Sequence, residues 1–264
     1  MSTKITILGC GSSGGVPRVG FGWGDCDPMN EKNRRTRCSL LVEKTIGSEK
    51  LSVLIDTGPD IRQQMLLADV QNLDAILYTH PHADHVHGID DLRTLAYKKR
   101  KKIPVWADLP TQKRLHEGFS YIFSTPKNSK YPPICMLNLI ENKTIKIACS
   151  QAQIEFLPLT VNHGDIDALG FKFENVVYMP DVLDIYPETW NQLQGLDLLI
   201  IDALRRNPHP SHTHLEKTLG WLQQLKPKKA ILTNFHNDLD YDLLKKELLD
   251  DIEPAFDGLK FFIN

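Results

Sequence analysis

The chain has 264 residues and carries 31 basic against 33 acidic side chains, a formal net charge of −2. Because this balance leaves no strongly basic face, a long nucleic acid is not expected as a partner. No apolar run approaches the roughly 18 residues of a membrane span, and the start MSTKITILGC lacks the features of a signal peptide, so we expect a single cytoplasmic domain over residues 1–264 with no membrane partner.

Short apolar runs recur along the chain and predict strands. They cover residues 5–8, 39–42, 53–55, 75–78, 154–159, 176–179, 198–201 and 230–232. Helical periodicity lies between them, near residues 60–68 and 110–123 and through the second half. This mixture predicts an α/β fold in which helices cover sheets. Residues 126–133 are expected to form a long surface loop.

The first predicted strand runs into a glycine-rich loop. Gly9, Gly11 and Gly14 spell GxGxxG, the pattern of a dinucleotide-binding loop when a helix follows directly. Val16 and Pro17 exclude such a helix, so we expect a tight loop in which glycine allows close approach of the backbone.

Two basic clusters follow this loop. Arg34, Arg35 and Arg37 have the guanidinium geometry of a phosphate clamp, with a solvated basic turn as the alternative. The cationic run at residues 98–102 is expected to be solvated surface.

The segment THPHADHVHG carries most of the chemical information in the sequence. His80, His82, Asp84 and His85 place four potential metal ligands within six residues, directly behind a predicted buried strand. Imidazole and carboxylate ligands that converge from one short loop suit zinc, manganese or iron. The segment therefore predicts a metal-dependent hydrolase.

Further ligand types stand where other predicted strands end. His163 follows FLPLTV, Asp181 follows VVYMP and His236 follows AILTNF. Ligands at several strand ends on one edge of a sheet make a pre-organised open site. Asp56 in LIDTG and Asp202 after LLII are expected to orient ligand histidines or to cap turns.

A helix start is predicted at Thr213, because Thr213 and Glu216 have capping-box spacing and apolar residues follow at helical intervals. This places His212 just outside the helix and His214 in its first turn.

The motif HxHxDH, followed by His, Asp and His in that order, resembles the metallo-β-lactamase superfamily of hydrolases over nearly the whole chain. The resemblance implies a four-layer αββα sandwich, with two mixed sheets packed face to face under outer helices, and two divalent metal ions, Zn or Mn. Carried onto this chain, one metal takes His80, His82 and His163, the other takes Asp84, His85 and His236, and Asp181 bridges them.

The segments GCGSSGGVPR, NEKNRRTRCSLLVE and DALRRNPHPSHTHLEKTL most resemble the phosphoribosyl cyclic phosphodiesterases of phosphonate breakdown and their relatives. That resemblance implies a small cyclic or nucleotide-like phosphodiester, cleaved by a metal-bridging hydroxide. A histidine before a helix assists catalysis in those enzymes, which matches His212, with His214 as the alternative. The structural zinc that they bind through several early cysteines is not expected here, because the loop keeps only Cys26.

The predicted roles are as follows. The catalytic residues are His212 and Asp84, and the substrate contacts are Arg34, Arg35, Arg37 and His214. The expected partner is a small phosphorylated substrate, and a homodimer is compatible with the resemblance. Three alternatives stay open: a transfer-RNA 3′-processing nuclease, although no long basic arm is evident; a glyoxalase-type thioester hydrolase; and a non-catalytic nucleotide- or metal-binding protein.

Overall fold

The computed structural model describes residues 2–263, which fall into two compact units. Unit 1 comprises residues 2–8, 39–155 and 260–263, and unit 2 comprises residues 9–38 and 156–259. Each unit is built on a mixed sheet with its own helices, as the predicted α/β class requires. Among residues 2–263 there is no helix with the length and apolar character needed to cross a bilayer.

The sheet of unit 1 has the order β15-β1-β2-β3-β4-β5-β6. Its strands are β1 (Ser2–Gly9), β2 (Ser39–Ile46), β3 (Glu49–Ile55), β4 (Ala75–Leu77), β5 (Ile103–Ala107), β6 (Cys135–Leu139) and β15 (Lys260–Ile263). Strands β3 to β6 run parallel, whereas β15 with β1 and β2 with β3 pair antiparallel. The remaining strand of this unit, β7 (Ile145–Cys149), pairs with β8 (Ala152–His163), which leads into unit 2.

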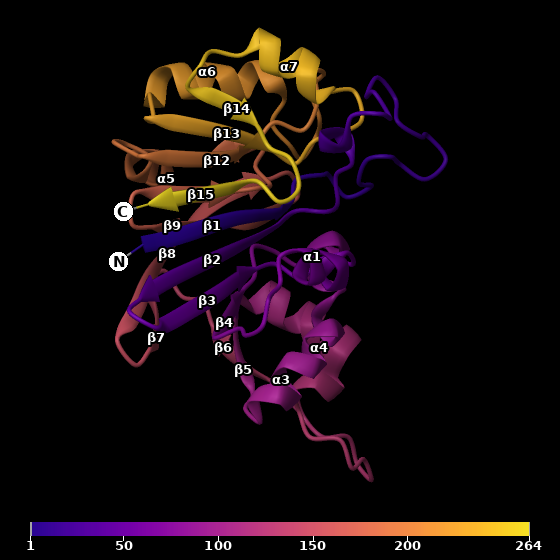
Figure 1. Ribbon diagram of the computed structural model, residues 1–264, viewed down its shortest axis with the longest axis vertical. Helices are drawn as coiled ribbons and strands as arrows, with labels where there is room; N and C mark the ends of the chain where they lie inside the picture. Colours follow the sequence, from indigo (N-terminus) through magenta and orange to yellow (C-terminus); the bar gives the residue numbers. More distant parts are fainter. Residues whose placement is uncertain (1, 264) are drawn as a thin grey trace. The chain divides into compact units, whose positions relative to one another are not determined.

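The helices of unit 1 lie along the parallel part of this sheet (Figure 1). They are α1 (Ile61–Leu67), α2 (Ala83–Val86), α3 (Arg93–Lys99) and α4 (Leu109–Phe123), with a 3-10 turn, η2 (Ile89–Leu92), before α3. Ile61 of α1 and Leu115 of α4 join Ile76 of β4 and Val105 of β5 in one buried apolar cluster. This packing anchors the loops at the carboxyl ends of β3 and β4.

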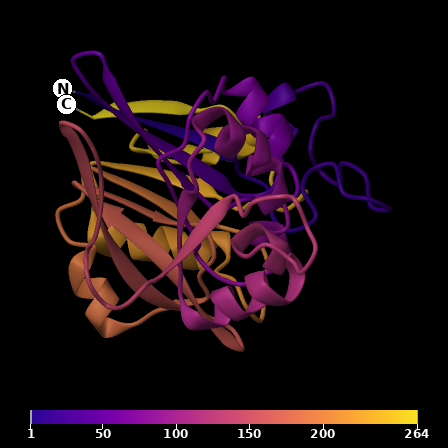
Figure 2. The same ribbon diagram turned by 90° about the horizontal axis from the view of Figure 1, so that it is seen from below.

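The sheet of unit 2 has the order β11-β8-β9-β10-β12-β13-β14. The strands besides β8 are β9 (Ile166–Phe173), β10 (Val176–Met179), β11 (Asp184–Ile185), β12 (Leu198–Asp202), β13 (Lys229–Thr233) and β14 (Ile252–Pro254). Its helices are α5 (Pro187–Gln192), α6 (Leu215–Leu225) and α7 (Tyr241–Glu247), with the 3-10 turn η1 (Glu31–Asn33). Strands β10, β12, β13 and β14 run parallel, and the loop from β1 to β2, in indigo and purple, projects outward in both views (Figures 1 and 2).

The strands that the sequence predicted are mostly those buried on both faces. Strands β10 and β12 are buried along their whole length, as parallel strands under helices are, and they read as continuous apolar runs. All eight predicted runs are confirmed as strands. The strands missed from the sequence include β5, which is short and contains Pro104, and β9, whose sequence contains Gly170.

The predicted helix start at Thr213 is wrong by one residue. Helix α6 begins at Leu215 with His214 at its N-cap, so His214 is not in the first turn. Tertiary bonding replaces the expected capping box, because Thr213 is buried, its N–H donates to the Val182 carbonyl at 2.6 Å, and its Oγ1 lies 3.1 Å from Thr218 Oγ1. The tight loop after β1 and the long loop at residues 126–133 are confirmed.

Truncation of a core phenylalanine measures how far stability depends on the sheet of unit 2. Phe171 of β9 has no exposed surface, so Phe171→Ala should lower the free energy of unfolding by about 3–5 kcal/mol in urea titrations of the metal-free protein. Phe262 of β15 is 68% exposed, and Phe262→Ala should change the free energy of unfolding by less than about 0.5 kcal/mol. Equal losses in the two variants would contradict the assigned core.

Candidate metal centre

In unit 1 the candidate ligands follow one strand end. Because β3 and β4 are parallel, their carboxyl ends meet at the same edge of the sheet. Asp56 directly follows β3, and the loop with His80 and His82 follows β4. Helix α2 then begins at Ala83, so Asp84 and His85 occupy its first turn. The succession of strand, loop and short helix brings these side chains together.

The three histidines of this loop lie against one another. His80 Nε2 is 3.0 Å from His82 Nδ1, and the ring centroids of His80 and His85 are 4.2 Å apart. Asp84 Oδ2 lies 3.4 Å from His85 Nε2. His80 and His85 are buried, whereas His82 is exposed. Clustered imidazole nitrogens beside a carboxylate are a donor set that suits a divalent transition metal.

Asp56 is fully buried and orients this cluster through hydrogen bonds. Its Oδ2 accepts from His85 Nδ1 at 2.7 Å and from Thr79 Oγ1 at 2.8 Å, while Oδ1 accepts from the Thr79 N–H at 2.8 Å. Burial raises the pKa of Asp56, and the interactions with His85 and Thr79 oppose that rise. With Nδ1 engaged in this way, His85 keeps Nε2 for a cation. The orienting role predicted for Asp56 is therefore matched by its hydrogen bonds.

In unit 2 a second cluster gathers at the ends of β8 and β10 and in the loop after β12. His163 is the last residue of β8, and its Nδ1–H donates to the Ser211 carbonyl at 2.6 Å. Its Nε2 then lies 3.9 Å from Asp181 Oδ1, and His212 Nδ1 lies 3.7 Å from the same oxygen. One potential ligand atom from each of the three residues falls within a span of 4.8 Å, which fits a metal-binding group.

His212 is also held by a buried carboxylate. Its Nδ1–H donates to Asp202 Oδ2 at 2.8 Å, and Asn234 Nδ2 lies 3.2 Å from the same nitrogen. Burial, with a contribution from Asp181, raises the pKa of Asp202 to about 7, while His212 acts to lower it. Asp202 therefore orients His212, the predicted catalytic histidine, and not one of the predicted ligand histidines.

His209 lies beside this group and was not predicted as a site residue. Its ring centroid is 5.1 Å from that of His212, and its Nδ1 accepts from the Ser211 N–H at 3.3 Å. Burial, followed by the nearby His212 and Arg205, lowers the pKa of His209 to about 4, so the ring is neutral near pH 7. The repeated histidines of NPHPSHTH were the available signal for it.

His236 and His214 stay predictions as site residues. His236 is partly exposed, its N–H donates to the Leu204 carbonyl at 2.8 Å, and its Nδ1 is 3.7 Å from Asp238 Oδ1. Burial and the cations of Arg18 and Arg205 lower its pKa, against the effect of Asp238. His236 is not part of the 4.8 Å group in unit 2.

The three predicted arginines do not share one environment. Arg35 is only 1% exposed, its guanidinium lies 4.6 Å from the Phe235 ring centroid, and it donates to the His236 carbonyl at 3.4 Å. A substrate contact does not fit a side chain buried in this way, and Arg35 instead supports the backbone at His236. Arg34 is exposed, and its guanidinium carbon lies 5.1 Å from the centroid of the Trp23 ring. The substrate-binding roles of Arg34 and Arg37 stay predictions.

Comparison with known proteins identifies relatives of the whole chain. Residues 52–235 match the sequence profile of the Beta-lactamase superfamily domain. The crystal structure of a new diphosphatase from the PhnP family is 33% identical and superposes with a TM-score of 0.89, covering 100% of this chain and 98% of that one. This agreement establishes the metallo-β-lactamase fold that the sequence resemblance implied.

Two curated relatives are longer than this chain. An octanoyltransferase of Porphyromonas gingivalis is 33% identical over 99% of this chain, which spans 52% of that protein. A ribonuclease Z of Aeropyrum pernix is 31% identical over 101 residues, 37% of this chain and 26% of that protein. The chain therefore spans about half or less of the length of these curated relatives.

The role of Asp56 can be tested without straining the backbone. Asp56 has φ +65°, a conformation that asparagine tolerates, so Asp56→Asn removes the charge and keeps the fold. We expect about tenfold or more weaker retention of zinc in competition with a chelator. Asp69→Asn is the matched control, because Asp69 also has positive φ, at 52°, and is exposed away from the histidines. Unchanged zinc retention in Asp56→Asn would refute the orienting role.

Proposed function

This chain belongs to the β-lactamase superfamily, and we propose that it is a metal-dependent hydrolase that cleaves a small phosphodiester with two divalent cations. The observation that carries this proposal is the pair of ligand clusters, one in each unit, each formed at the carboxyl ends of strands. Their histidine and carboxylate donors suit zinc or manganese.

The proposed ligands are the seven that the family pattern assigns. They are His80, His82, Asp84 and His85 of unit 1, His163 and Asp181 of the unit 2 cluster, and His236, which lies outside that cluster and is assigned by the family pattern alone. Two such cations, when bound, would lower the pKa of a bound water to about 7 and would neutralise the oxygens of an in-line phosphoryl displacement. Asp84, at the start of α2, is proposed to accept the proton of the attacking water.

His212 is proposed to protonate the departing alkoxide as the bond from phosphorus to oxygen breaks. The hydrogen bond from Nδ1 to Asp202 leaves Nε2 as the donor. A histidine just before a helix N-terminus is disfavoured as a cation, and the Asp202 carboxylate 2.8 Å away offsets that cost. Neutral His209 beside it is suited to donate a hydrogen bond from Nε2 to a phosphoryl oxygen.

The proposed substrate is a small phosphorylated molecule, such as a phosphoribosyl cyclic phosphate or a nucleotide-like diester. The likeness to a PhnP-family diphosphatase over the full length of both chains supports chemistry at phosphorus. We place the reaction in the cytoplasm, which the free thiols of all five cysteines support.

Acyl hydrolysis is the second candidate. The P. gingivalis relative that aligns with 99% of this chain is named an octanoyltransferase, so its name concerns an acyl group. A metal centre that polarises a carbonyl would cleave a thioester or ester with the same ligands. This alternative corresponds to the glyoxalase-type reaction considered from the sequence.

Two histidine variants separate metal binding from proton transfer. His82→Ala removes a proposed ligand and should abolish turnover together with most bound metal. His212→Ala should lower kcat by about 100-fold or more while the metal content stays that of the wild type. Metal analysis and phosphodiester kinetics on the same preparations measure both effects. Equal loss of metal in the two variants would refute the separate role of His212.

A substrate comparison distinguishes the two candidate reactions. Protein loaded separately with Zn²⁺ or Mn²⁺ is assayed on a cyclic phosphodiester, a linear aryl phosphodiester, a dinucleoside diphosphate and an octanoyl thioester. We expect kcat/KM for a phosphodiester to exceed that for the thioester by about 100-fold or more, because the site is proposed to be selective for a phosphoryl group. A preference for the thioester with both metals would transfer the assignment to acyl hydrolysis.

A further inference from the structure

Arg18 lies on the loop between β1 and β2, and its guanidinium packs on a glycine of the same loop. A Cβ added to Gly14 would lie 2.7 Å from Arg18 Nε and 3.2 Å from Arg18 Cζ. Gly14 is the last glycine of the GxGxxG pattern. The absence of a side chain at position 14 therefore leaves the space that the guanidinium occupies.

The backbone around Arg18 is bonded to the segment that carries His236. The Arg18 N–H donates to the Gly22 carbonyl at 2.8 Å, and the Gly22 N–H donates back to the Arg18 carbonyl at 2.8 Å. Asn237 Nδ2 donates to the same Gly22 carbonyl at 3.3 Å, and the Asp25 N–H donates to the Asn237 carbonyl at 2.8 Å. These bonds hold the turn that begins at Arg18 beside the residue after His236.

The charge of Arg18 also acts on His236. Burial and then the Arg18 cation are the main causes that lower the pKa of this imidazole. Because Coulomb interactions weaken with distance, this effect agrees with the position that the backbone bonds give to Arg18. Within unit 2, the guanidinium therefore lies near a proposed metal ligand, where part of the substrate is expected to bind.

Other arginines of unit 2 are already engaged. Arg205 donates to two carbonyls of its own loop, at 3.0 and 2.6 Å, and Arg206 pairs with Glu247 at 2.7 Å. Arg18 is half-buried, lies 5.9 Å from the ring centroid of Phe21, and forms no ion pair with a carboxylate of residues 2–263. A guanidinium of this kind is available to an anionic ligand, and its planar fork matches the oxygens of a phosphate.

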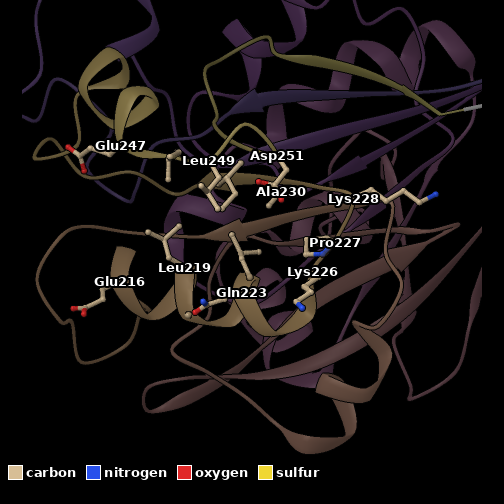
Figure 3. A pocket seen from close by; sticks show the side chains of 14 residues that line it. Glu216, Leu219, Gln223, Lys226, Pro227, Lys228, Ala230, Glu247, Leu249 and Asp251 are labelled. Atoms are coloured by element: carbon tan, nitrogen blue, oxygen red, sulfur yellow. The ribbon is translucent and has the colours of Figure 1, made fainter.

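The groove between α6 and the chain that leads from α7 into β14 does not offer the same environment. It has a volume of about 960 Å³ (Figure 3). The charged side chains that line it include Glu216, Glu247, Lys226 and Lys228. Because carboxylates and ammonium groups share this groove, an anion would be less favoured there than beside Arg18.

We propose that Arg18 is a specificity-determining residue that binds a second phosphate of the substrate, a phosphomonoester separate from the scissile diester. The assignment rests on the proposed phosphodiesterase function and narrows the substrate to molecules with two phosphoryl groups. Arg37 also approaches this loop, since a Cβ added to Gly15 would lie 4.0 Å from Arg37 Nη1. Two guanidinium groups beside consecutive glycines suit the dianion of a phosphomonoester better than the single charge of a diester.

Two matched substrates test this assignment on the full zinc-loaded chain. They are adenosine 2′,3′-cyclic phosphate with and without a 5′-phosphate. In the wild type the 5′-phosphate should raise kcat/KM by about 10- to 100-fold, because hydrogen bonds between a guanidinium and a phosphate are strong. Arg18→Ala should remove this gain and change kcat/KM for the substrate without the 5′-phosphate by less than about threefold. Arg18→Lys, which keeps the charge without the planar fork, should retain part of the gain.

Gly14→Ala provides a second variant, because its added Cβ displaces the guanidinium and leaves Arg18 in the chain. It should reduce the gain from the 5′-phosphate in the same direction as Arg18→Ala. The matched controls are Gly220→Ala, where an added Cβ meets nothing within 4 Å, and Arg62→Ala, which removes an exposed guanidinium on α1. Both controls should keep the full gain. An unchanged gain in Arg18→Ala, or equal losses of kcat/KM for the two substrates, would overturn the assignment.

Calorimetry separates this inference from the proposed reaction. Adenosine 3′,5′-bisphosphate and adenosine 3′-monophosphate are titrated into the same zinc-loaded proteins. The wild type should bind the bisphosphate about tenfold or more tightly than the monophosphate, and Arg18→Ala should bind the two with similar affinity. If neither cyclic diester is cleaved, the phosphodiesterase proposal fails, and this ratio of affinities alone decides the role of Arg18. Equal affinities in the wild type, or a preference that Arg18→Ala retains, would overturn that role.

Discussion

Buried imidazole and carboxylate groups must be hydrogen bonded, and this constraint organises the strand ends in both units. Asp56 accepts three hydrogen bonds in unit 1, from two groups of Thr79 and from His85. In unit 2 the Ser211 carbonyl accepts from His163, and Asp202 accepts from His212. In each case one ring nitrogen is bonded to the protein, which directs the other nitrogen toward the site.

The backbone at these positions is shaped by the same requirement. Asp56 and Asn234 directly follow strands β3 and β13 and have φ of 65° and 64°, a conformation in which short polar residues are tolerated better than most. Gly164 follows His163 with φ +76°, and a Cβ there would lie 2.8 Å from Ser211 Cβ. Glycine therefore lets the Ser211 carbonyl approach close enough to hold His163.

Helix α6 begins beside the candidate site of unit 2. Its N-cap, His214, lies two residues after His212. The Thr213 bonds to Val182 and Thr218 hold the start of the helix in place of the capping box expected from the sequence. The same bonds therefore also restrict the position of His212, the residue before Thr213.

The sequence by itself determined the strands buried on both faces, the order of the ligand residues and the chemistry of the HxHxDH loop. These are local properties, because continuous apolar runs and short chelating spacings are visible in one segment. Only the tertiary structure decided that Arg35 is buried against Phe235, that Asp202 orients His212, that His209 lies beside His212, and that His214 occupies the N-cap position of α6. The Arg35 and Asp202 contacts join separate segments of the chain, the N-cap of α6 depends on competition between tertiary and local hydrogen bonds, and the approach of His209 to His212 depends on the course of the loop after β12. Spacing in the sequence encodes none of these.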